Sequence, residues 1–168
     1  MRKLTGVGAG LALLLAVAGL AVAGDNGNYS VHLNGDTEVP ANSSQGVGQA
    51  VFHLSPDGTS LDYKLIVANL DNPVAAHIHL GPPGVNGPVV AFLFGPAAPG
   101  GGTANGVIAE GTITAANLVG PLAGQPLSAL VEALNSGNAY VNVHTNDGVP
   151  PAGTGPGDLP GGEIRGNF

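Results

Sequence analysis

Glycine, proline, asparagine and aspartate cut this chain into short runs, and few regular elements can be long. The 168 residues include 29 glycines and 14 prolines, and the runs between them alternate in polarity or are rich in β-branched residues. Proline lacks the N–H that a central strand or a helix interior uses, and glycine favours turns. This pattern is typical of an all-β sandwich or barrel of antiparallel strands.

Eight runs have the composition of strands. They cover residues 29–33, 48–54, 60–67, 75–80, 89–94, 106–114, 139–144 and 163–168. One segment differs, because apolar residues recur at helical spacing between Pro126, which is tolerated in a first turn, and Gly137, which ends helices. We predict one short helix there, at about residues 126–136. Residues 95–105 and 146–162 are rich in glycine and proline and predict surface loops.

The beginning of the chain has the pattern of an export signal. Arg2 and Lys3 precede an uncharged apolar stretch over residues 5–20, and Ala-Val-Ala at residues 21–23 is a small-x-small cleavage pattern. We expect a signal peptide at 1–23, a short N-terminal segment at 24–28 and one domain at 29–168. The apolar stretch is short for a membrane span and no second one follows. We therefore expect a secreted, periplasmic or cell-surface protein without a membrane anchor in the mature chain.

Charge and the lack of cysteine exclude several classes of function. Export would leave Lys64 and Arg165 against eleven carboxylates, a net charge of about −9. Such a surface repels phosphate backbones, so no nucleic-acid partner is expected. Thiol-redox and blue-copper chemistry are excluded because there is no cysteine and the one methionine is Met1. No nucleophile elbow, phosphate-binding loop or His-Glu-x-x-His motif occurs, so an enzyme is less expected than a binding protein.

Three histidines stand at positions that strands place together. His77 and His79 point to the same face of their strand because successive side chains alternate, and His144 ends a second strand whose valines face the other way. We predict that the three rings converge on one transition metal, copper or zinc, at one mouth of the β-framework. The second nitrogen of a ligand histidine is usually held by a carbonyl or carboxylate. The candidates for that contact are Asn142, Thr145, Asp147 and Glu163.

The polar residues also have structural interpretations, which remain open at this point. The three histidines could hydrogen-bond to the backbone and to one another and so order residues 80–88. His32 and His53 alternate with apolar neighbours and are expected on solvated faces. Arg165 either contacts an anion near a metal or forms a structural pair, and Glu38 either contacts a partner or anchors its own loop.

Four motifs in order resemble the CHRD domain, which is named for its repeats in chordin and also occurs as a single exported unit in bacteria. They are residues 33–40 (Leu-Asn-Gly-Asp-Thr-Glu-Val-Pro), 75–79 (Ala-Ala-His-Ile-His) with the glycines and prolines behind it, 137–145 (Gly-Asn-Ala-Tyr-Val-Asn-Val-His-Thr) and 162–166 (Gly-Glu-Ile-Arg-Gly). The resemblance implies an immunoglobulin-like sandwich. Residues 146–161 form a longer link than is usual in the family. Whether this link closes over the histidines or extends into solvent is open.

A fainter similarity is to the copper-zinc superoxide dismutase sandwich, which also has a His-x-His strand, a late Val-His strand end and an arginine near the C-terminus. Here His77, His79, His144 and Arg165 would take those places in the same order. No histidine lies between His79 and His144, so the bridging imidazole of a two-metal centre is missing. The expected fold is thus an immunoglobulin-like or superoxide-dismutase-like antiparallel sandwich.

Three functions follow from these patterns. The first is an exported CHRD-domain binding module for an extracytoplasmic protein or matrix partner. The second is a mononuclear copper or zinc protein for storage, delivery or redox defence, with ligands His77, His79 and His144 and with supporting or anion-contacting residues Asn142, Glu163 and Arg165. The third is superoxide dismutation, which is disfavoured because an anionic substrate would approach a strongly negative chain.

Overall fold

The computed structural model describes residues 27–168, so the predicted signal peptide lies outside the described residues. The described chain contains strands β1 (Asn28–Asn34), β2 (Val47–Leu54), β3 (Leu61–Asp71), β4 (Pro73–Leu80), β5 (Val89–Phe94), β6 (Thr103–Ile113), β7 (Ala139–Thr145) and β8 (Ile164–Asn167). It also contains helix α1 (Leu127–Asn135) and the 3-10 turns η1 (Gly35–Thr37), η2 (Ala115–Asn117) and η3 (Gly120–Leu122). Every predicted strand and the predicted helix are present, which confirms the all-β prediction.

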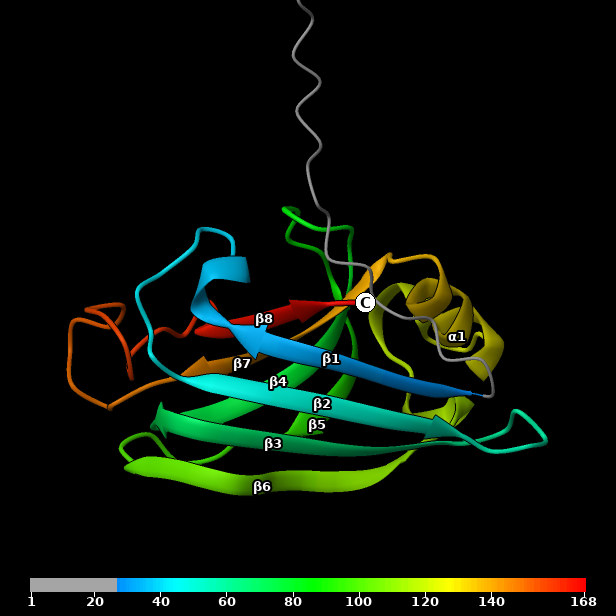
Figure 1. Ribbon diagram of the computed structural model, residues 1–168, viewed down its shortest axis with the longest axis horizontal. Helices are drawn as coiled ribbons and strands as arrows, with labels where there is room; N and C mark the ends of the chain where they lie inside the picture. Colours follow the sequence, from blue (N-terminus) through cyan, green and yellow to red (C-terminus); the bar gives the residue numbers. More distant parts are fainter. Residues whose placement is uncertain (1–26) are drawn as a thin grey trace, which may run out of the picture.

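All the strands belong to one antiparallel sheet with the order β5-β4-β7-β8-β1-β2-β3-β6. The sheet curls until its two edge strands, β5 and β6, come into contact (Figure 1). Tyr63 on β3 donates its hydroxyl hydrogen to the Leu93 carbonyl on β5 at 2.8 Å, across the remaining gap. The predicted sandwich is therefore formed by one continuous sheet that is nearly a barrel.

The inside of the curled sheet is the hydrophobic core. Alternate residues of every strand point into it, among them the fully buried Leu33, Leu65, Ile78, Val141 and Ile164. Burying an aliphatic side chain of this size contributes about 1.5–3 kcal/mol relative to leaving it in water. The chain has no disulfide, so this packing provides most of its stability.

Helix α1 covers one end of the barrel, and the long loop between β7 and β8 lies at the opposite end (Figure 1). The helix begins after Pro126, whose backbone is extended, and it buries one apolar side through Leu127, Leu130, Ala133 and Leu134. Gly137 follows with a φ of 71°, a left-handed conformation that suits glycine, and the Asn138 N–H returns to the Ala133 carbonyl at 2.9 Å. No helix within residues 27–168 has the length and apolar character needed to cross a bilayer.

Two predicted strand boundaries were wrong by more than two residues. The loop expected at residues 95–105 is shorter, because β6 already begins at Thr103. Strand β3 continues to Asp71, beyond its predicted end, and Asp71 pairs with Thr103. Pairing with β3 therefore makes the start of β6 a strand, although the glycines there predicted a loop.

We predict that Ile78→Ala lowers the free energy of unfolding by about 2–5 kcal/mol, because it leaves a cavity in a core that cannot fully collapse around it. Ile78 is 0 % exposed on β4. Urea denaturation measures the change. Ile66→Ala, on the partly exposed outer face of β3, is the matched control and should cost about 1 kcal/mol or less. Equal losses in the two variants would contradict the assignment of inner and outer faces.

Candidate metal centre

The three histidines lie on the outer face of the sheet. Ile78 and Val141 point into the core, so the neighbouring His77 and His79 on β4, and His144 on β7, point away from it. The prediction that the rings share a face is confirmed. Their expected position at a mouth of the β-framework was wrong, since strand alternation places them outside the barrel wall.

The register of β4 against β7 brings these side chains into one patch. His77 is paired with Asn142, His79 with Tyr140, and Ala75 with His144. His77 and His144 are thus diagonal neighbours, and side chains in this relation lie about 7–8 Å apart at the backbone, within reach of long side chains. One potential ligand nitrogen of each histidine consequently lies within 4.8 Å of the other two.

Two of the rings are oriented by peptide carbonyls. His79 Nδ1 is 2.9 Å from the Gly87 carbonyl, and His144 Nδ1 is 2.9 Å from the Pro160 carbonyl. A carbonyl oxygen only accepts, so both Nδ1 atoms carry hydrogen and both Nε2 atoms present a lone pair. His144 Nε2 lies 3.0 Å from His77 Nδ1 and accepts its hydrogen. His79 Nε2 is buried and has no hydrogen-bond partner.

Glu163 and Thr145, two of the residues expected to hold the histidines, have other roles. Backbone carbonyls hold the Nδ1 atoms, and no sequence pattern marks a carbonyl. Glu163, only 1 % exposed, instead accepts hydrogen bonds from the Thr145 hydroxyl, from the Ser44 hydroxyl at 2.5 Å and from the Gly157 N–H at 2.7 Å. Glu163 therefore fastens the loop at residues 146–162 to the sheet.

The long loop closes over the histidines. The Leu159 N–H donates to the Thr145 hydroxyl at 2.9 Å, beside the contact between Pro160 and His144. The question that the sequence left open is thus resolved in favour of closure. The other side of the patch is more accessible: His77 is partly exposed, and Phe92, 56 % exposed, packs edge-on against it with ring centroids 5.0 Å apart.

Arg165 supports the patch from the neighbouring strand. Its guanidinium lies 3.4 Å from the centre of the Tyr140 ring, and His79 stacks on the same ring with centroids 4.7 Å apart and planes 9° apart. Because β7 lies between β4 and β8, Tyr140 has His79 on one side and Arg165 on the other. The guanidinium also donates to the loop after β4, at the carbonyls of Pro82 and Val85 and at Asn86 Oδ1. This is the structural role that the sequence left as one alternative.

Glu38 is buried against this patch, with only 6 % of its surface exposed. Burial raises the pKa of Glu38 from 4.5 to about 7, opposed by the Val39 N–H, by Arg165 and by Asn142. A residue at this depth does not meet a protein partner directly. Of the two interpretations of Glu38, the structure therefore favours the internal one.

The histidines are held neutral by their surroundings. Burial, with smaller contributions from His144 and His79, lowers the pKa of His77 from 6.5 to about 4. Burial also lowers the pKa values of His79 and His144. At neutral pH the rings are uncharged, and protons do not compete for their lone pairs.

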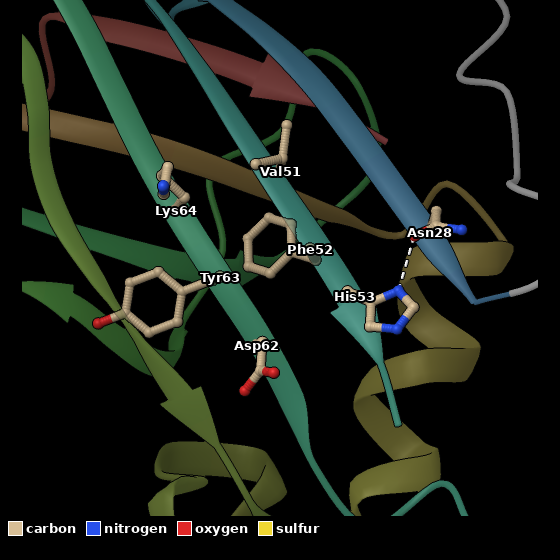
Figure 2. A pocket seen from close by; sticks show the side chains of 7 residues that line it. All are labelled: Asn28, Val51, Phe52, His53, Asp62, Tyr63 and Lys64. Carbon is tan, nitrogen blue, oxygen red and sulfur yellow. Dashed lines mark hydrogen bonds between the residues drawn. The ribbon is translucent and has the colours of Figure 1, made fainter. Parts of the chain in front are cut away.

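The remaining histidines lie elsewhere, as predicted. His32 and His53 are exposed on the outer faces of β1 and β2. Figure 2 shows His53 beside a shallow hollow over β2 and β3, with its Nδ1 2.7 Å from Asn28 Oδ1. The polar groups along this hollow are engaged in pairs: Asp62 accepts from the Thr112 hydroxyl, and Lys64 meets Glu110. It contains no converging set of ligand atoms among the described residues.

Comparison with known families agrees with the four motifs. The model of the CHRD domain family matches residues 29–154. This chain belongs to the CHRD family. The match includes all three clustered histidines of this CHRD domain and ends inside the long loop, before the motif that carries Glu163 and Arg165. No curated protein and no solved structure gives a significant match.

In the metal-free protein, we predict that stability falls with acidification and that His77→Gln reduces this fall. Unfolded His77 takes up a proton near pH 6.5, whereas the folded ring resists it until about pH 4. The stabilising effect of the neutral ring is therefore complete above pH 6.5 and is lost between these values. The contribution of Glu38 to stability changes with pH in the opposite direction, but Glu38 is present in both proteins and does not affect the comparison. Urea titrations at several pH values in this range measure how the free energy of unfolding changes with pH. The control variant His32→Gln, at an exposed position, should show the same change as wild type.

Proposed function

We propose that this CHRD domain is an exported binding module that holds one copper or zinc ion through His77, His79 and His144. One observation carries the proposal: His79 Nε2 is buried beside the other two rings and has no hydrogen-bond partner. An unsatisfied buried acceptor costs about 1–3 kcal/mol. A purely structural histidine network explains the Gly87 and Pro160 contacts but leaves this atom without a role.

The donor set agrees with the preferences of these metals. Copper and zinc favour imidazole nitrogen, and zinc commonly takes three protein ligands and one further ligand. A tetrahedral ion with bonds of about 2.0–2.1 Å separates its donors by about 3.4 Å. His77 Nδ1 and His144 Nε2 are now 3.0 Å apart. Binding thus needs the two rings to separate by a few tenths of an ångström, with the hydrogen on His77 moving to Nε2.

The surroundings favour a cation that arrives from solvent. The rings are neutral at physiological pH, so the metal displaces few protons. His77 and His144 are each partly exposed, which gives an approach to the cluster. The net charge of −7 for the whole chain raises the local concentration of cations. Export is supported by the N-terminal sequence pattern, and storage, delivery and redox defence are the uses that fit an exported site of this kind.

Superoxide dismutation receives no further support. Steering an anion toward the metal needs a free cationic group, and Arg165 is 0 % exposed with its guanidinium engaged by loop oxygens and by Tyr140. The proposed function is therefore metal binding, without a catalytic step assigned to it.

The test is metal analysis of protein purified without a histidine tag. After loading with Cu²⁺ or Zn²⁺ and removal of free metal, we expect about one ion per chain. We expect close to none for His79→Ala, because it removes the buried nitrogen that has no other partner. Circular dichroism should show both proteins folded, and the exposed His53→Ala should bind like wild type. A wild-type ratio near zero with both metals rejects the proposal.

A further inference from the structure

Asn142 is the polar residue at the centre of the proposed site, and one atom of its side-chain amide has no hydrogen-bond partner. The side chain is 3 % exposed and lies opposite His77 on the paired strand, two residues from His144. Its oxygen, Oδ1, is buried without a hydrogen-bond partner. Glu38 Oε1 and His79 Nε2 are also buried without hydrogen-bond partners.

The orientation of the amide follows from its neighbours. A Cβ atom at Gly162 would collide with Glu38 Oε1 and would lie 2.9 Å from Asn142 Nδ2, so both atoms lie close beneath that glycine. The nitrogen end of the amide therefore lies on the side of Glu38. The oxygen end is left on the side of the histidines, because Asn142 is paired with His77 across the two strands and shares a face with His144, two residues later.

This arrangement leaves two buried acceptors without a donor in the same patch. His79 donates through Nδ1 to Gly87, so its Nε2 carries a lone pair. Asn142 Oδ1 carries lone pairs only. Buried acceptors without a partner are unfavourable unless a cation or a donor reaches them. The conflict disappears if both atoms bind the same metal ion.

We propose that Asn142 Oδ1 is the fourth protein ligand of the metal centre, with Glu38 holding the amide in the coordinating orientation. The inference rests on the proposed function, since it completes that site. Gly162 has a φ of 131° and no side chain, which lets the loop lie directly over the pair formed by Glu38 and Asn142. The resulting set is three imidazole nitrogens and one amide oxygen.

This donor set favours divalent copper or zinc over monovalent copper. Soft sulfur ligands favour Cu⁺, whereas nitrogen and oxygen donors favour Zn²⁺ and Cu²⁺. Glu38 is the carboxyl group beside the amide, and its ionised form stabilises a divalent ion more than a monovalent one. We therefore infer that the site takes a divalent ion in preference to Cu⁺.

Asn142→Leu tests the ligand with Zn²⁺ affinity and with the visible spectrum of the Co²⁺-loaded protein. Leucine has a similar volume but no donor atom, so we expect Zn²⁺ binding to weaken about 10–100-fold, the size of effect seen when a supporting contact at a metal site is lost. We also expect azide to change the Co²⁺ spectrum of the variant, where the fourth position is open, and to leave that of wild type unchanged. Unchanged Zn²⁺ affinity together with an azide-sensitive wild type overturns the inference.

A second variant covers the case in which Asn142→Leu fails to fold. The double variant Glu38→Gln with Asn142→Asp exchanges the donor and the acceptor of the pair and presents a carboxylate oxygen to the metal. We expect it to bind Zn²⁺ at least as tightly as wild type, with a Co²⁺ spectrum that azide does not change. Weaker binding than wild type, with azide sensitivity, counts against Asn142 as a ligand. If wild type binds no metal at all, the proposed function itself fails, which distinguishes the two results.

Discussion

The burial of Arg165 is the interaction on which the proposed site depends. A guanidinium with no exposed surface is stable only when its N–H groups and its charge are satisfied. The loop after β4 supplies the carbonyls of Pro82 and Val85, and Tyr140 supplies an aromatic face. The same loop then presents the Gly87 carbonyl to His79. An interaction on β8 thereby determines how a histidine on β4 is oriented.

Strand β7 connects the stability of the fold with the site, because both of its faces are buried. Val141 and Val143 complete the core, while Tyr140, Asn142 and His144 form the outer patch under the loops. A strand held in this way has little freedom to shift, so the side chains of the patch keep their spacing without a bound ion. The alternation of one short segment, residues 140–144, thus serves packing on one side and chemistry on the other.

Much of this could be predicted from the sequence because strand periodicity is local. The strands, helix α1 and the common face of His77 and His79 follow from alternation, helical spacing and turn residues. The surroundings of Asn142 were only partly visible: it alternates with His144, but nothing local shows that Glu38, from a distant loop, lies near it beneath Gly162. No sequence pattern could indicate that the carbonyls of Gly87 and Pro160 orient the histidines, because every residue has a carbonyl group. The closure of the long loop was equally hidden, since it depends on the contacts of buried Glu163 with Thr145 and Gly157.

The sequence by itself determined the all-β class, the CHRD motifs and the set of three histidines, since each is carried by residue types at short spacing. Only the tertiary structure decided that the sheet curls nearly into a barrel and that the histidines lie on its outer wall. The pairing of β4 with β7 joins residues that are 59 to 72 positions apart, and its register is set by hydrogen bonds and packing over the whole sheet. The alternation of Val141 and Val143 excludes a shift by one residue, which would move His144 and Asn142 into the core. A shift by two residues would keep the faces but change which side chains lie beside His77 and His79, and no local pattern excludes it. The site is therefore a consequence of long-range pairing, which a linear reading of the chain cannot supply.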